Sequence, residues 1–132
     1  MAVHVGIIDQ DPIRLLTPML DSRTISNHII FIGVSDQSEM YLRLDSVLRK
    51  RGLSSEFFEI PDVANPTQIK SSLSLLTQKL LDRKEEIKLN ASCGLRHRLL
   101  SVYEIFRSNE WPIFVVEPTT DKLCWLYPNG KE

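Results

Sequence analysis

The segment from residue 90 to residue 98, Asn-Ala-Ser-Cys-Gly-Leu-Arg-His-Arg, carries the side chains with the clearest chemistry in this chain. An amide, a hydroxyl, a thiol and a glycine precede a helix whose first turn is strongly basic. Positive charges there oppose the helix dipole by about 0.3–1 kcal/mol each. A bound anion would offset this cost and accept hydrogen bonds from backbone amides and guanidinium groups. The segment therefore indicates a local phosphate-binding site.

Simpler interpretations of the same residues are also open. Arg96 and Arg98 could pair with exposed carboxylates, such as those of the loop after the first strand. His97 could be an ordinary exposed or packed side chain. Cys93 could be a small residue in a tight place, because no nucleophile with its own base is evident nearby in sequence.

A second polar loop, Asp9-Gln10-Asp11-Pro12, follows an apolar run. It lacks the glycine-rich dinucleotide fingerprint and carries two carboxylates where a pyrophosphate would lie, so NAD binding is disfavoured. Asp11 stands before a proline, which is typical of a helix N-cap and first turn. Asp9 and Gln10 are then the candidates for hydrogen bonds to a base or a ribose.

Strand and helix patterns alternate along the chain. Short apolar runs predict strands at 3–8, 28–32, 56–60, 87–90, 113–116 and 123–127. Apolar residues at helical spacing predict helices between them: one after Pro12, one behind a capping box of Asp36 and Glu39, one opened by Asn65-Pro66 that carries Ile69, Leu73, Leu76 and Leu80, and one with Leu95, Leu99, Val102 and Phe106 on one face.

This alternation predicts an α/β, Rossmann-like fold with a mostly parallel six-stranded sheet, helices on both faces and an antiparallel last strand. In the Rossmann strand order the first and fourth strands are central neighbours. Ligands bind beyond the carboxyl ends of such strands, where the winding of the chain reverses. The loops after Ile8 and Leu89 therefore form the predicted site.

Length and composition set the remaining expectations. The 132 residues fit one domain, 1–132, with 42% hydrophobic and 25% charged residues. A net charge of −1 gives no field for a polyanion, so direct binding of duplex nucleic acid is not expected. Two cysteines suit neither a disulfide framework nor a zinc site, and no apolar run could span a membrane. We expect a cytoplasmic protein without metal or cofactor.

Segments 5–12 and 90–103 resemble the CRISPR-associated Rossmann-fold (CARF) domain. More narrowly, they are similar to the N-terminal domain of the CARF-nuclease family, whose fuller members carry a restriction-endonuclease-like domain behind it. The resemblance covers essentially the whole chain. It implies a homodimer that binds cyclic oligoadenylate, above all cyclic tetra-adenylate, across its two-fold axis in the antiviral response of type III CRISPR systems.

The family's loop after the fourth strand commonly reads Asn, any residue, Thr, Gly, Gly, Thr, Lys. Asn90, Ser92, Gly94 and Arg96 match or resemble this pattern, whereas Cys93 and Leu95 replace a glycine and a threonine. The resemblance implies that Arg96 meets a phosphate, that Ser92, Asn90 and Gln10 bond ribose or adenine, and that Gly94 lets the backbone approach. The predicted ligand-binding set is Asp9, Gln10, Asp11, Asn90, Ser92, Cys93, Gly94, Leu95, Arg96 and His97.

A sensor is favoured over a catalyst, because no nuclease motif lies within residues 1–132. The chain is then expected to be either an isolated sensing domain or a domain that an effector nuclease domain follows. The main alternative is a ring nuclease, in which Ser92, Arg96 and His97 would help a ribose 2′-hydroxyl attack the adjacent phosphorus without a metal. A phosphoacceptor receiver domain fits less well, because Glu117-Pro118 stands where receivers resemble one another in a lysine-proline pair.

Overall fold

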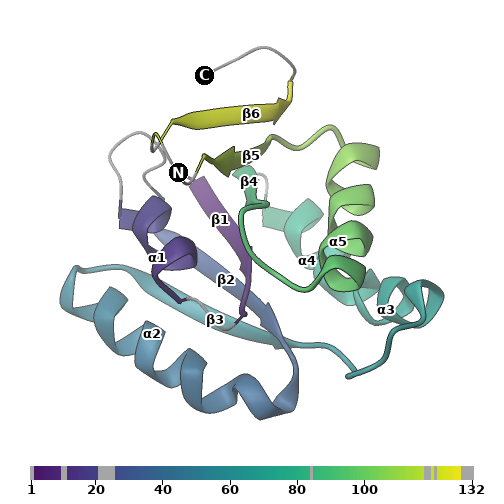
Figure 1. Ribbon diagram of the computed structural model, residues 1–132, viewed down its shortest axis with the longest axis horizontal. Helices are drawn as coiled ribbons and strands as arrows, with labels where there is room; N and C mark the ends of the chain where they lie inside the picture. Colours follow the sequence, from purple (N-terminus) through teal and green to yellow (C-terminus); the bar gives the residue numbers. More distant parts are fainter. Residues whose placement is uncertain are drawn as a thin grey trace.

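The computed structural model describes residues 2–9, 12–20, 26–83, 85–117, 120 and 122–128 (Figure 1). Its strands form one six-stranded sheet in the order β3-β2-β1-β4-β5-β6. The strands are β1 (Ala2–Ile7), β2 (His28–Gly33), β3 (Ser54–Glu59), β4 (Glu86–Asn90), β5 (Ile113–Val116) and β6 (Leu123–Tyr127). Strands β1 to β5 pair in parallel, and β6 runs antiparallel to β5. The predicted fold class and strand order are confirmed.

Two helical layers cover the sheet (Figure 1). The helices are α1 (Pro12–Leu20), α2 (Ser38–Lys50), α3 (Pro66–Ser72), α4 (Ser74–Arg83) and α5 (Arg96–Ser108). Residues of α1 and α2 pack into one core cluster, whereas α3, α4 and α5 contribute to the other. The central strands face both clusters, which is why β1 and β2 read as nearly continuous apolar runs. Within the described part of the chain, no helix is both long and apolar enough to cross a membrane.

The helix predicted after Asn65 is two helices. Asn65 caps the first of them, since its Oδ1 accepts a hydrogen bond from the Thr67 backbone at 2.9 Å. The break at Leu73 lies within a serine-rich stretch, where Ser72 Oγ donates to Ile69 O and Ser74 Oγ donates to Ser71 O, at 2.7 and 2.8 Å. Such hydroxyls compete with the backbone for its carbonyl groups. The apolar period alone does not reveal this competition.

The capping box predicted at Asp36 and Glu39 is wrong. A short 3₁₀ turn, Ser35–Gln37, precedes α2, so the N-cap position falls on Gln37. The Gln37 side chain instead accepts from the Val34 backbone N–H at 2.9 Å and donates to the Ile8 carbonyl at 3.0 Å. Gln37 thereby ties the end of β2 to the end of β1. It fixes the edge of the sheet from which the predicted site is built.

Candidate functional site

The two predicted loops meet at the carboxyl edge of the sheet. Strands β1 and β4 are neighbours, with Gly6 opposite Asn90 in the register. Just beyond them, the Gly94 backbone N–H donates to Asp9 Oδ2 at 2.9 Å. This bond joins the β1 and β4 loops across a separation of 85 residues in sequence. It also means that an anion bound here does not meet the Gly94 amide unless Asp9 moves.

Asn90 and Ser92 shape the β4 loop from inside. Asn90 is fully buried, its Oδ1 accepts from the Ser92 backbone N–H at 3.0 Å, and its Nδ2 donates to the Leu15 carbonyl at 3.5 Å. The Ser92 hydroxyl accepts from the Val116 backbone N–H at 2.8 Å. Both side chains therefore hold the loop against β5 and α1. For Asn90, this burial favours a positioning role over direct contact with a ligand.

Gly94 is required by the geometry of the turn. Its φ of +112° lies in a region that side-chain-bearing residues rarely adopt, and an added Cβ would lie 2.9 Å from the Ile7 side chain. Cys93 beside it is only 2% exposed and packs in the core cluster below α1 and α2. The interpretation of Cys93 as a small residue in a tight place agrees with this burial.

Helix α5 begins without a capping side chain. Its N-cap is Leu95, an apolar residue that is 48% exposed, so the prediction that Leu95 belongs to the helix's buried face is wrong. The first N–H groups bonded inside the helix are those of Arg98 and Leu99, which both donate to the Leu95 carbonyl. The amides of Arg96 and His97 have no acceptor within the helix. No acceptor for these two amides lies among the described residues, and unbonded amides at the positive end of a helix dipole favour an anion.

The side chains of this first turn add to that preference. Arg96 is exposed, His97 is half-buried, and the turn contains no acidic residue. Among the described residues, Arg96 forms no ion pair. Both line a hollow of about 430 Å³ beside α3, together with Pro66, Leu100, Ser101 and Glu104. The hollow is large enough for a group of nucleotide size, and Arg96 and His97 are the basic residues of its lining.

Arg98 pairs with Asp62 and not with a carboxylate of the β1 loop. Its Nη2 donates to Asp62 Oδ1 at 3.1 Å, and Asp62 lies in the loop between β3 and α3, not in the β1 loop. The basic pattern of the first turn signals Arg98, but nothing local in sequence signals Asp62, which is 36 residues away. Gln10 and Asp11, predicted in the β1 loop, lie outside the described residues.

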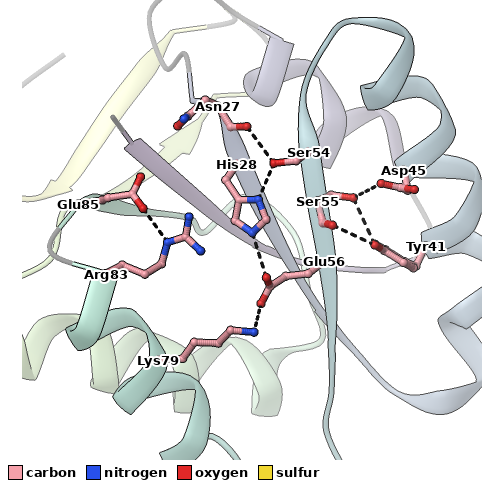
Figure 2. Close-up of polar contacts among 10 residues, drawn as sticks. All are labelled: Asn27, His28, Tyr41, Asp45, Ser54, Ser55, Glu56, Lys79, Arg83 and Glu85. Carbon is pink, nitrogen blue, oxygen red and sulfur yellow. Dashed lines mark hydrogen bonds and ion pairs between the residues drawn. The ribbon is translucent and has the colours of Figure 1, made fainter.

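A second polar cluster occupies the opposite edge of the sheet, where β2 and β3 begin (Figure 2). His28 Nδ1 lies 2.7 Å from Ser54 Oγ, and its Nε2 lies 3.0 Å from Glu56 Oε2. Lys79 of α4 donates to the other Glu56 oxygen at 2.5 Å. Burial acts to raise the pKa of Glu56, but the hydrogen bonds and charges of Lys79 and His28 outweigh it and lower that pKa. This cluster ties α4 to the edge strand β3.

The other face of β3 is held in the same way (Figure 2). Asp45 of α2 is 8% exposed and accepts from Ser55 Oγ at 2.5 Å and from Arg49 Nε at 2.8 Å. Tyr41 donates to the Ser55 carbonyl at 3.3 Å. Polar contacts on both faces thus stabilise an edge strand that carries only two phenylalanines as apolar residues. Both networks lie away from the candidate site and are structural.

Several solved structures are similar to this chain. No protein-family model matches the sequence, and no curated protein does either. Protein VC1899 from Vibrio cholerae matches with a TM-score of 0.94 and 62% sequence identity over 99% of this chain and 34% of VC1899. The chain thus spans about a third of the length of that protein.

Two more distant structures are also similar. Can2 from Sulfobacillus thermosulfidooxidans, solved in complex with cyclic tetra-adenylate, matches with a TM-score of 0.76 and 16% identity over 100% of this chain and 36% of Can2. A type III CRISPR defence DNA nuclease activated by cyclic oligoadenylate matches with a TM-score of 0.73 and 12% identity over 94% of this chain and 19% of the nuclease. This chain shares its fold with all three proteins.

Proposed function

We propose that this chain is a CARF domain that senses cyclic oligoadenylate in type III CRISPR signalling. The observation that carries the proposal is the start of α5, where uncapped amides and Arg96 gather beside the junction of the β1 and β4 loops. Can2 and the DNA nuclease support the proposal. Can2 was solved in complex with cyclic tetra-adenylate, the nuclease is activated by cyclic oligoadenylate, and both proteins share this fold over nearly the whole of this chain. Cyclic tetra-adenylate is the proposed ligand.

The proposed assembly is a homodimer with the ring on its two-fold axis. A symmetric ring presents the same phosphate and base twice, so an isologous dimer can offer each half the same patch. In this arrangement Arg96 binds a phosphate, and His97 and the Ser92 hydroxyl lie along the ring. Asp9 and Gln10 are proposed to meet the ribose or adenine, while Asn90, Cys93 and Gly94 keep the β4 loop in shape. An effector domain would read out the bound state.

Replacement of Arg96 tests this site directly. Arg96→Ala removes an exposed guanidinium, and loss of one charge-assisted hydrogen bond costs about 1.5–3 kcal/mol, or roughly 10- to 150-fold in Kd. Arg43→Ala is the matched control, because Arg43 is an exposed arginine of α2 and the change in net charge is the same. Calorimetric titration with cyclic tetra-adenylate should show weaker binding only for Arg96→Ala. Equal affinities in the two variants would remove Arg96 from the site.

A ring nuclease is the second candidate function, because Arg96 and His97 line one hollow. Both groups could stabilise charge on a phosphate that a ribose 2′-hydroxyl attacks. Incubation with cyclic tetra-adenylate, followed by chromatography, separates the two functions. Intact rings support a sensor alone, whereas linear products that disappear in His97→Ala would support turnover.

A further inference from the structure

Arg98 is a buried cation whose hydrogen-bonding capacity is only partly used. Its side chain is 5% exposed, and one nitrogen, Nη2, donates to Asp62 at 3.1 Å. The Nε–H group is buried and has no acceptor among the described residues. A buried donor left without an acceptor destabilises the folded state, and more so when it belongs to a charged group. The present state of the protein therefore leaves Arg98 under-satisfied.

Asp62 is a weak partner for such a group. Its side chain is 69% exposed, so water screens its charge and weakens its attraction for the Arg98 guanidinium. Desolvation of the Arg98 guanidinium costs several kcal/mol, and its place in the first turn of α5 adds repulsion from the helix dipole. A stronger or additional anion near Arg98 would offset these costs.

The direction of the side chain identifies where that anion would bind. Long side chains in a helix point back toward its N-terminus, so the Arg98 side chain extends over the turn that begins at Leu95. That turn carries the uncapped amides of Arg96 and His97. Figure 1 shows the segment before α3 passing beside the start of α5. The exposed carboxylate of Asp62 is the anion that this segment brings to the buried guanidinium.

We propose that Arg98 is an anion-binding residue of the α5 N-terminus and that Asp62 is an internal substitute for a ligand phosphate. A phosphate that reaches the uncapped amides displaces the Asp62 carboxylate and accepts from the Arg98 guanidinium. This step deepens the proposed function and depends on it for the identity of the ligand, whereas the anion site itself does not.

Displacement of Asp62 would also carry a signal. Pro61–Asn65 is an irregular, mostly exposed segment, and its Val63 N–H bonds only within the segment, to the Pro61 carbonyl. The Arg98–Asp62 pair joins this segment to α5. Release of the pair removes this link between the segment and α5, so occupancy of the site is coupled to the contact between them.

Asp62→Asn separates this role from a purely structural one. A structural ion pair predicts unchanged or weaker ligand binding when it is broken, whereas an internal competitor predicts tighter binding. We expect Asp62→Asn to lower the apparent Kd for inorganic phosphate about three- to tenfold, because Kd falls as the fraction of molecules with an open site rises. Asp82→Asn, an exposed aspartate of α4 with the same change in charge, should leave Kd within about twofold of the original.

Nuclear magnetic resonance titration with inorganic phosphate gives the readout, since the Arg98 Nε–H signal should shift on binding. In the Arg98→Met background, Asp62→Asn should bring no gain, and the neutral Arg98→Gln replaces Arg98→Met if the latter does not fold. A Kd for Asp62→Asn equal to or above that of Asp82→Asn would overturn the inference, as would a gain that persists without Arg98.

The same variants titrated with cyclic tetra-adenylate keep the two proposals apart. Tighter phosphate binding in Asp62→Asn without any binding of the ring would support the anion site and refute the proposed function. Ring binding that Asp62→Asn leaves unchanged would support the proposed function and refute the role of Asp62.

Discussion

Gly94→Ala is expected to destabilise the protein through two separable costs. The first is conformational: a φ of +112° is strained for any residue with a side chain, at about 1–3 kcal/mol. The second is steric, because the new Cβ would lie 2.9 Å from two atoms of the Ile7 side chain. Crowding of a packed core costs about 1–3 kcal/mol. Together the free energy of unfolding should fall by about 2–6 kcal/mol.

Gly52→Ala carries the first cost alone, so the difference between the two variants gives the second. Gly52 also has a positive φ, +77°, but an added Cβ would have no atom within 4 Å. Its replacement should cost about 1–2 kcal/mol from the backbone alone. Urea denaturation of both variants gives the comparison, and Gly94→Ala should lose at least about 1 kcal/mol more. Equal losses would show that the β4 loop does not pack on Ile7 as described, and the site geometry built on Gly94 would be wrong.

Two further predictions concern stability. The lowered pKa of Glu56 means that its ion pairs stabilise the fold fully above the unfolded value of 4.5 and are lost as pH falls below it through the folded value. Urea denaturation from neutral to acidic pH should therefore show less acid sensitivity in Glu56→Gln, and an unchanged pH dependence would contradict this. Asn65→Ala removes the α3 cap and should cost about 0.5–2 kcal/mol, with Gln78→Ala in α4 as the comparison. Thermal unfolding that does not separate these two variants would exclude a capping role.

The sheet was predictable because its signals are local and repeated. Apolar runs such as 28–32 are typical of buried strands. Their alternation with helices favoured the Rossmann strand order, and the structure has this order. That order also brought the β1 and β4 loops together, and the bond from Gly94 to Asp9 confirms that they meet. The prediction that these two loops lie together depended on the strand order and not on any sequence motif.

The finer features depended on contacts that a sequence pattern does not contain. Ser72 and Ser74 end α3 by bonding carbonyls of the preceding turn, although the apolar period runs on through Leu73. A capping box was expected from Asp36 and Glu39, whereas the side chain that acts here is Gln37, which bridges the ends of β1 and β2. The pairing of Arg98 with Asp62 joins two loops far apart in sequence, so only the fold could identify the partner.

We propose that the start of α5 helps to hold a cyclic oligoadenylate between two copies of this chain. Calorimetric titration with cyclic tri-, tetra- and hexa-adenylate, beside linear oligoadenylates of the same lengths, tests it most directly. We predict tight binding of cyclic tetra-adenylate with one ring for every two chains, and much weaker binding of the linear forms. Absence of binding by all three rings, or one ring for each chain, would contradict the claim.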